Sequence, residues 1–250
     1  MKFIVSTLVF LVSMMAGAQV NQTDAKGKKQ GVWEKVYPGT RVYMYRGEFK
    51  DDKPIGKFSY FYKSGKTKAI IEHDPASSRS VGYFYHETGG VMSYGIYQNL
   101  QKDSVWTSFD NQGVMTIKET YYKDSLHGTR VVFYPPEEGA QRQIPSQVSN
   151  YKNGVLDGNY NEYFPNATVK VKGQYVNGKK HGVWETYHVT GKMMMLNRYK
   201  EGAKHGWCMG YDEQGKEIGK KYFYYGRLLE GKQLKEKMDQ MKKLGINPNE

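Results

Sequence analysis

The sequence predicts an all-β protein, an elongated antiparallel β-meander or solenoid of about eight 24-residue hairpin repeats, which ends in a short C-terminal capping helix. The first observation is the composition, because 28 Gly and 22 Tyr among 250 residues are typical of short strands and tight turns. The second is a motif that recurs every 24 residues. The third is an exclusion: one cysteine rules out an internal disulfide framework, and 38% hydrophobic residues rule out a disordered chain.

The first predicted element is an export signal over residues 1–18. Lys2 precedes an apolar run from Phe3 to Met15, and a small-residue cleavage site ends at Ala18. We expect cleavage after Ala18, which makes Gln19 the first residue of the mature chain. The alternative is a membrane anchor, but the run is shorter than the roughly 18 apolar residues that a span needs. The mature protein is therefore expected to be exported, to the periplasm, to the outer membrane or out of the cell.

A repeat organises residues 31–231, and residues 19–30 precede it as a leader or partial repeat. The segments Tyr175–Tyr187 and Tyr199–Tyr211 are similar at an offset of 24 residues. One equivalent position, which we call the reference residue, recurs in eight units: Gly31, Gly56, Ser80, Ser104, Gly128, Gly158, Gly182 and Gly206. The spacing is 24 or 25 residues throughout, except for 30 residues between Gly128 and Gly158.

Each unit is predicted to form two short strands. In the unit of Gly182 they run from Val183 to His188 and from about Met194 to Lys200. Because glycine adopts a positive φ at little cost, we expect the reference residues to lie at turns. Hairpins joined in this way form a meander of on the order of sixteen strands, spaced about 4.8 Å apart.

Two aromatic columns follow the reference residue. The column five residues after it is the more uniform: Val36, Phe61, Tyr85, Phe109, Phe133, Tyr163, Tyr187 and Tyr211. The column two residues after it is varied: Trp33, Phe58, Gly82, Trp106, Arg130, Tyr160, Trp184 and Cys208. The two columns face opposite sides of a regular strand, although a bulge would reverse this parity. We expect the uniform column in the core and the varied column on an open or half-buried face, which makes Trp33, Trp106 and Trp184 candidate partner contacts.

The insertion between Gly128 and Gly158 falls near residues 135–145. Three prolines and the absence of alternation argue against a strand there, so the segment is expected to run over the surface. One interpretation is a tolerated surface insertion. The other is a docking loop with Ile144 as its apolar anchor, and the candidate contacts are then Glu137, Glu138, Arg142 and Ile144.

The last element lies beyond Gly231, in residues 232–250. Leu234, Met238 and Met241 recur at helical spacing among charged residues. This pattern predicts an amphipathic helix that folds over the last strand, with a frayed tail as the alternative.

No catalytic, cofactor or metal site is predicted. His127, His181 and His205 share one repeat position, but equivalent residues in successive hairpins lie two strands, or about 10 Å, apart. A bond between histidine and zinc is near 2.1 Å, so these side chains cannot share one ion. Cys208 stands in the varied column and is expected to be a small buried hydrophobic residue. The sequence therefore indicates a protein that is not an enzyme.

The motif Tyr-x-x-Gly-x-x-His-Gly, at residues 175–182 and 199–206, resembles the MORN repeat. The longer period and the Gly-x-Trp that follows are similar to its bacterial variant, found in YwqK-type antitoxins. Residues 151–158 match with Asp157 in the place of histidine, and the unit of Ser80 has nearly lost the motif. The resemblance implies an elongated β array that serves interactions and has no shared catalytic centre. An antitoxin would need a cytoplasmic toxin, which conflicts with the predicted export signal.

The formal net charge of +12 is spread along the chain and interleaved with acids, and export argues against a nucleic-acid partner. Our leading hypothesis is an exported, non-catalytic repeat scaffold that binds another protein of the bacterial cell envelope. The alternatives are a module that binds glycan or anionic lipid, and an antitoxin-like member of a toxin–antitoxin pair. The oligomeric state stays open.

Overall fold

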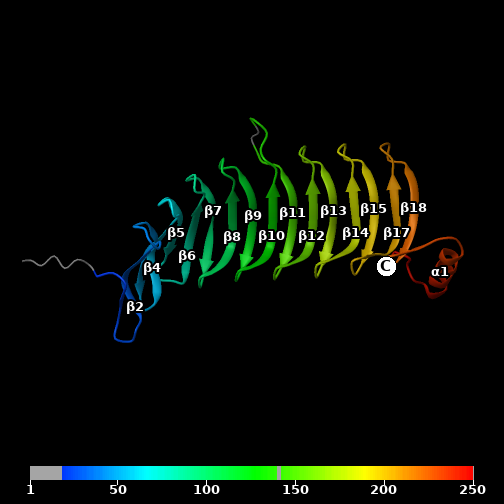
Figure 1. Cartoon of the computed structure of the whole chain (residues 1–250). Helices are drawn as coiled ribbons and strands as arrows, with labels where there is room; N and C mark the ends of the chain where they lie inside the picture. Colours follow the sequence, from blue (N-terminus) through cyan, green and yellow to red (C-terminus); the bar gives the residue numbers. More distant parts are fainter. Residues whose placement is uncertain (1–18, 140–141, 250) are drawn as a thin grey trace, which may run out of the picture.

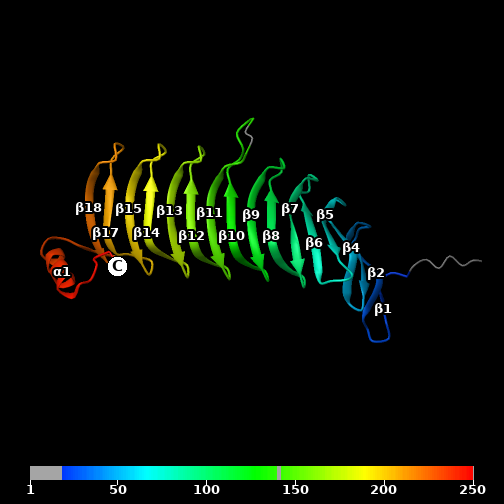
Figure 2. The same ribbon diagram turned by 180° about the vertical axis from the view of Figure 1, so that it is seen from behind.

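The structure is a computed structural model that describes residues 19–139 and 142–249. The predicted export signal and Ala18 lie outside the described residues, and Gln19 is the first residue inside them. Within these ranges, nineteen antiparallel strands follow one another in a single open meander, and one helix follows them (Figures 1 and 2). This confirms the prediction of an elongated all-β meander with a short C-terminal helix.

Sixteen long strands make eight hairpins, as the repeat predicts. They are β2 (Lys29–Val36), β3 (Tyr43–Lys50), β4 (Lys53–Phe61), β5 (Thr67–His73), β6 (Arg79–Tyr85), β7 (Val91–Gln98), β8 (Gln101–Phe109), β9 (Met115–Tyr122), β10 (Ser125–Phe133), β11 (Pro145–Lys152), β12 (Val155–Tyr163), β13 (Val169–Val176), β14 (Lys179–Tyr187), β15 (Met193–Lys200), β17 (Gly206–Tyr211) and β18 (Glu217–Tyr224). Three short strands complete the sheet: β1 (Gln22–Thr23), β16 (Ala203–Lys204) and β19 (Arg227–Leu229). Strand β1 pairs with Lys29 and Gln30 of β2, so residues 19–30 form a partial hairpin.

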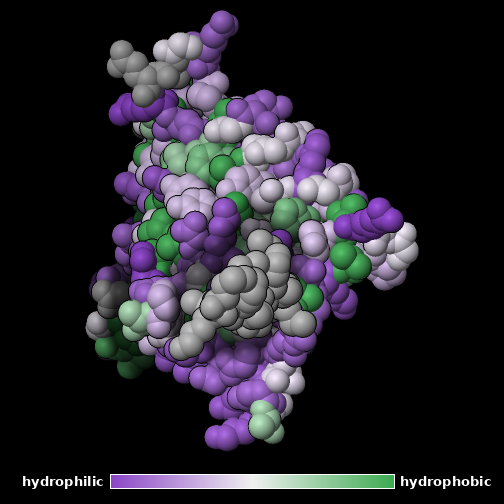
Figure 3. Space-filling view, turned by 90° about the vertical axis from the view of Figure 1, so that its left-hand side faces the viewer, coloured by the Kyte–Doolittle hydropathy of each residue, from purple (hydrophilic) through white to green (hydrophobic). Residues whose placement is uncertain are grey.

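The turns lie along two edges of the sheet, which are the upper and lower edges in Figure 1. Most lower turns are tight, as at Asn177 and Gly178, which both have positive φ. Most upper turns span five residues, as where the His188 N–H donates to the Lys192 carbonyl over 2.8 Å. Seen from the N-terminal end, hydrophilic residues predominate along both edges, and hydrophobic residues lie mainly between them (Figure 3).

The reference residues do not lie at turns, so that expectation is wrong. Gly182 lies inside β14 with φ +66°. There β14 carries two extra residues, because Lys172 pairs with Glu185 whereas Gln174 pairs with His181. The physical reason is that a bulge, like a turn, requires a positive φ, which glycine adopts without strain. Seven of the eight reference residues have a positive φ, and Ser80 is the exception.

The varied column forms the core of one face, as the unit of Trp184 shows. Trp184 is only 4% exposed. Its ring lies over Gly173, where an added Cβ would stand 2.3 Å from the ring. Tyr175 and Tyr199 meet the ring edge-on, with centroids 5.0 and 6.1 Å away. The Lys180 ammonium lies 4.1 Å from the ring centroid, a cation–π contact.

The same arrangement recurs along this face, and we call it the aromatic ladder. Its rings are Trp33, Phe49, Phe58, Tyr97, Trp106, Tyr121, Tyr160, Tyr175, Trp184 and Tyr199. Gly95 seats Trp106 and Gly47 seats Phe58, and in both cases a Cβ would fall under 2.5 Å from the ring. A glycine eleven residues before the ring is therefore part of the core.

The uniform column lies on the opposite face and is half-buried, with Val36 exposed at 42%. Our assignment of the two columns is therefore wrong. Uniformity was a poor guide to burial, because a large ring becomes buried only where the neighbouring strand offers a flat seat. The seat glycine lies on the side of the varied column.

The helix α1 (Gly231–Leu244) covers the C-terminal end, as predicted. Met241 is buried against Tyr222 and Leu229, and Leu234 and Met238 pack around them. Figure 1 places α1 beside the lower half of β18.

Candidate functional site

The central repeat, with Gly128 as its reference residue, departs from the others in two ways. It carries the insertion between β10 and β11. It also interrupts the aromatic ladder, because Arg130 occupies the ring position and Glu119 occupies the position of the seat glycine. On the other side, Arg130 pairs with Ser149 of β11. Both departures meet in one hairpin, which we take as the candidate site.

Polar side chains replace the rings here in a connected set that we call the central network. Arg130 Nε donates to Glu119 Oε1 over 2.9 Å, and its Nη1 donates to Gln147 Oε1 over 3.3 Å. Gln147 Nε2 donates to the Tyr160 hydroxyl over 2.8 Å, and that hydroxyl donates to Glu162 Oε1 over 2.6 Å. About a fifth of the Arg130 and Glu119 side chains stays exposed, at 23% and 21%. Partial burial of a charge pair costs desolvation free energy, which good geometry and further hydrogen bonds offset.

One buried polar atom beside the network lacks a hydrogen bond. Ser149 is fully buried, and its Oγ has no partner among the described residues. Ser149 pairs with Arg130 on one side and with Tyr160 on the other. It occupies the position at which Gly173 seats Trp184 in a regular unit.

Reasoning from the sequence missed Glu119, Gln147 and Ser149. In regular units a lysine stands four residues before the tryptophan and a glycine stands eleven residues before it, as for Trp106 and Trp184. Neither residue type stands at these two positions before Arg130, and this difference could have been seen in the sequence.

The network changes the acidity of two tyrosines. Burial, together with the hydrogen bond that its hydroxyl donates to Glu119, raises the pKa of Tyr121 to about 12. Burial and the hydrogen bond to Glu162 raise the pKa of Tyr160 as well. In each case a carboxylate accepts a hydrogen bond from the hydroxyl, so an ionised tyrosine would face a like charge.

We expect the protein to lose stability between about pH 10 and pH 12. An unfolded tyrosine has a pKa of about 10, and folded Tyr121 has a raised pKa of about 12. In that window the folded state holds more protons than the unfolded state, so the free energy of unfolding falls as the pH rises. Urea midpoints at pH 9 and pH 11.5 measure the effect. Tyr121→Phe should show a smaller fall between the two pH values, and an equal fall would contradict the role given to Tyr121.

The insertion is anchored at its base. The upper connection runs from Tyr134 to Ile144, and the Tyr134 N–H donates to the Ile144 carbonyl over 2.9 Å. Gln143 Nε2 donates to the Met115 carbonyl over 2.7 Å. In Figure 1 this connection rises above the other upper turns. Two of its residues, 140 and 141, lie outside the described ranges.

A hollow of about 400 Å³ lies between this connection and the next upper turn. Three of the predicted contacts, Glu137, Arg142 and Ile144, line it, and Pro165 and Asn166 form the opposite side. Glu137, Glu138 and Arg142 are exposed, whereas Ile144 is half-buried. The structure therefore brings three of the four predicted loop residues together at one point of the upper edge, and Glu138 lies outside this lining.

The three predicted tryptophan contacts lie elsewhere. Trp106 and Trp184 are 3% and 4% exposed and belong to the aromatic ladder, so they have almost no surface for a partner. Trp33 is half-buried, and its indole N–H donates to the Gln22 carbonyl of β1 over 3.2 Å. The three rings stand in three separate repeats and form no common surface with the loop.

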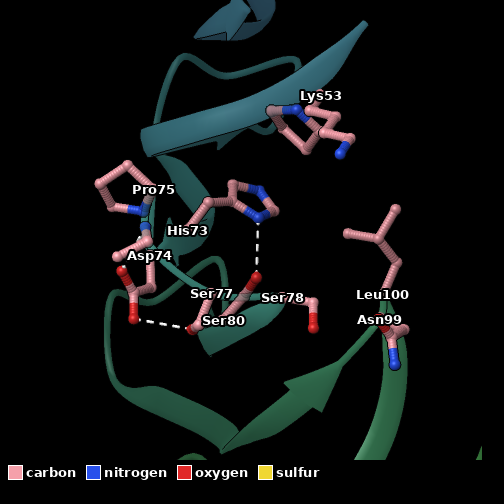
Figure 4. Close-up of a pocket in the computed structure, with 11 residues that line it drawn as sticks. Lys53, His73, Asp74, Pro75, Ser77, Ser78, Ser80, Asn99 and Leu100 are labelled. Atoms are coloured by element: carbon pink, nitrogen blue, oxygen red, sulfur yellow. Dashed lines mark hydrogen bonds between the residues drawn. The ribbon is translucent and has the colours of Figure 1, made fainter.

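A second hollow, of about 560 Å³, lies at the lower edge by the unit of Ser80 (Figure 4). This unit has no bulge between β5 and β6, and a longer turn joins the two strands. His73 Nδ1 and Ser80 Oγ are 2.8 Å apart. The carboxylate of Asp74 accepts from the Ser77 hydroxyl and the Ala76 N–H instead of orienting His73. Asp74 therefore does not complete a catalytic relay with the Ser–His pair.

Within residues 19–139 and 142–249, no three His, Cys, Asp or Glu side chains gather closely enough to hold a metal ion. Cys208 is buried, as expected. No helix in the described part of the chain has the length and apolarity needed to cross a membrane.

The chain matches no model of a known protein family, and it matches no curated protein. Its class is that of an all-β repeat array, and its function has to be inferred from the geometry above.

Proposed function

We propose that this protein is an exported, non-catalytic repeat scaffold that binds another protein of the bacterial cell envelope, as a relative of the MORN-repeat variant proteins. The observation that carries the proposal is the double departure of the central repeat. A uniform array offers a partner equivalent surfaces at every step. The insertion and the central network break that uniformity together in one hairpin, which gives a partner a distinct place to dock.

The chemistry of the hollow suits a protein surface. Glu137 and Arg142 provide exposed charges of both signs, and Ile144 provides apolar area between them. Interfaces combine an apolar centre with a polar rim in this way. The anchored base holds these groups in place, which reduces the entropy that binding has to overcome.

Shortening the insertion tests this proposal. Residues 135–143 are replaced by Lys-Ser-Gly, the residues of the regular turn at 63–65, which removes six residues. We expect the melting temperature to stay within a few degrees, because loop length has a small effect on stability. Binding of the partner identified in a pull-down of the mature protein from envelope extracts should weaken.

The control is Glu213→Gln, in the exposed part of a regular upper turn. It should bind the partner at full strength. Full-strength binding by the shortened protein would refute docking at the insertion, and a collapsed melting transition would show that the loop is structural.

One observation favours a glycan or lipid headgroup as the alternative ligand. On the face opposite the aromatic ladder, Tyr83 and Tyr94 are exposed at 36% and 40%. Tyr94 stacks on Phe109, with ring centroids 5.9 Å apart and an interplanar angle of 23°. Flat exposed rings of this kind suit amphipathic ligands. Saturable binding in a screen of cell-wall glycans and anionic vesicles would favour this alternative over a protein partner.

A further inference from the structure

The C-terminal edge of the sheet is only half covered. The lower residues of β18, from Tyr222 to Tyr224, pair with β19 on their outer side. The chain then leaves the sheet at Glu230 and enters α1. No described segment pairs with the outer side of residues 217–221, and all five are exposed. Figures 1 and 2 show α1 beside the lower half of β18 and leave its upper half free.

The same positions are paired everywhere else in the array. One repeat earlier, Met195 and Leu196 of β15 pair with the upper half of β17. Two repeats earlier, Val171 and Lys172 of β13 pair with the upper half of β14. Gly219 and Lys220 are the equivalents of these residues at offsets of 24 and 48. The upper half of β18 therefore presents a row of unpaired backbone groups whose geometry already matches an added strand.

The other end of the sheet does not present such an edge. There β1 pairs with the lower half of β2. Beyond that pairing, the Asn21 N–H donates to the Val32 carbonyl over 2.8 Å. Asn21 Oδ1 accepts the N–H of Glu34 over 2.9 Å. Among the described residues, the chain thus covers its first edge strand as far as Glu34 and leaves the upper half of the last one open.

One interior strand pair, β13 with β14, indicates which side chain of an added strand would suit Lys220. Lys172 of β13 forms a salt bridge of 2.6 Å with Glu185 on the strand beside it. Lys220 occupies the same position in β18, and its ammonium is held 5.1 Å from the centroid of the Trp207 ring. Lys216 and Lys221 add positive charge around it, and Glu217 is the only acid between them. The exposed Ile218, at 69%, offers apolar contact.

We propose that the upper half of β18 binds an extended acidic peptide segment of a partner protein by β-strand addition, with a carboxylate of that segment on Lys220. This site rests on the scaffold role proposed above but uses a surface separate from the central repeat. Edge lysines also discourage aggregation in many sheets. The pairing of Lys172 with Glu185 adds a more specific expectation, a carboxylate opposite Lys220.

The test uses a strand that the array already accepts. The probe is a labelled synthetic peptide of residues 182–190, which contains the Glu185 and Thr186 that pair with β13. We expect it to bind the full mature chain saturably in a fluorescence anisotropy titration. Lys220→Glu should weaken binding by roughly tenfold, the scale expected for reversal of a charge pair. A peptide with lysine in place of Glu185 should recover binding to Lys220→Glu.

Three controls decide the outcome. Lys57→Glu, at an exposed lysine of β4, should leave binding unchanged. A peptide with alternate N-methylated residues should not bind, because strand addition needs the backbone N–H groups. Absence of binding, equal binding by Lys220→Glu, or binding of the methylated peptide would each overturn the proposal. The shortened insertion should bind the probe normally, so failure at the edge is distinct from failure of docking at the central repeat.

Discussion

Replacing Trp184 with alanine should lower the free energy of unfolding by about 3–5 kcal/mol, the usual cost of removing a buried aromatic ring. Trp184 is 4% exposed. Its loss removes the ring that Gly173 seats, the edge-on contacts with Tyr175 and Tyr199, and the closer cation–π contact of Lys180. The midpoint of a denaturant melt, at an unchanged slope, measures the effect.

Tyr187→Ala is the matched comparison, because Tyr187 stands three residues further along the same strand. Its side chain is half-buried on the opposite face, and its hydroxyl donates to Glu185 over 2.8 Å. We expect this variant to lose clearly less stability than Trp184→Ala. Equal losses, or a larger loss for Tyr187→Ala, would mean that the aromatic ladder is not the core.

Replacing Gly173 with alanine should also destabilise the protein strongly, although it adds only one methyl group. The new Cβ would stand 2.3 Å from the Trp184 ring, so the ring has to leave its seat. Overpacking of this kind costs about 1–3 kcal/mol. Gly219→Ala is the control, because Gly219 lies within β18 without a positive φ, and a Cβ added to it would have no neighbour within 4 Å. It should leave the midpoint nearly unchanged.

A double variant separates the clash from a backbone effect. In a protein that already carries Trp184→Ala, the methyl group at residue 173 meets no ring. Gly173→Ala should then cost little, and the two changes together should cost less than their sum. An additive result would show that Gly173 is needed for its backbone conformation and not as a seat for the ring.

The local pattern was enough to predict the architecture. A period of 24 residues and the helical spacing of Leu234, Met238 and Met241 specify short paired strands and a terminal helix. These features depend on neighbours close in sequence. The place of the insertion followed from the spacing of 30 residues between Gly128 and Gly158.

The candidate site was predicted only in part. The loop residues Glu137, Arg142 and Ile144 were found because prolines and a broken period are visible in the sequence. The central network was not found. Glu119, Arg130 and Gln147 come from three strands, and their contacts depend on cross-strand register.

The choice of the buried face shows the limit most clearly. Alternation along β14 indicates that Trp184 and Tyr187 face opposite sides, and it says nothing about which side is buried. That choice depends on Gly173, which lies eleven residues before Trp184 and reaches it only because the bulge at Gly182 sets the register of β13 against β14. Residues near in sequence therefore determined the strands, the turns and the repeat of this protein. Contacts between strands decided which aromatic column became its core, because burial of a ring requires both a flat seat beneath it and neighbours that close around it.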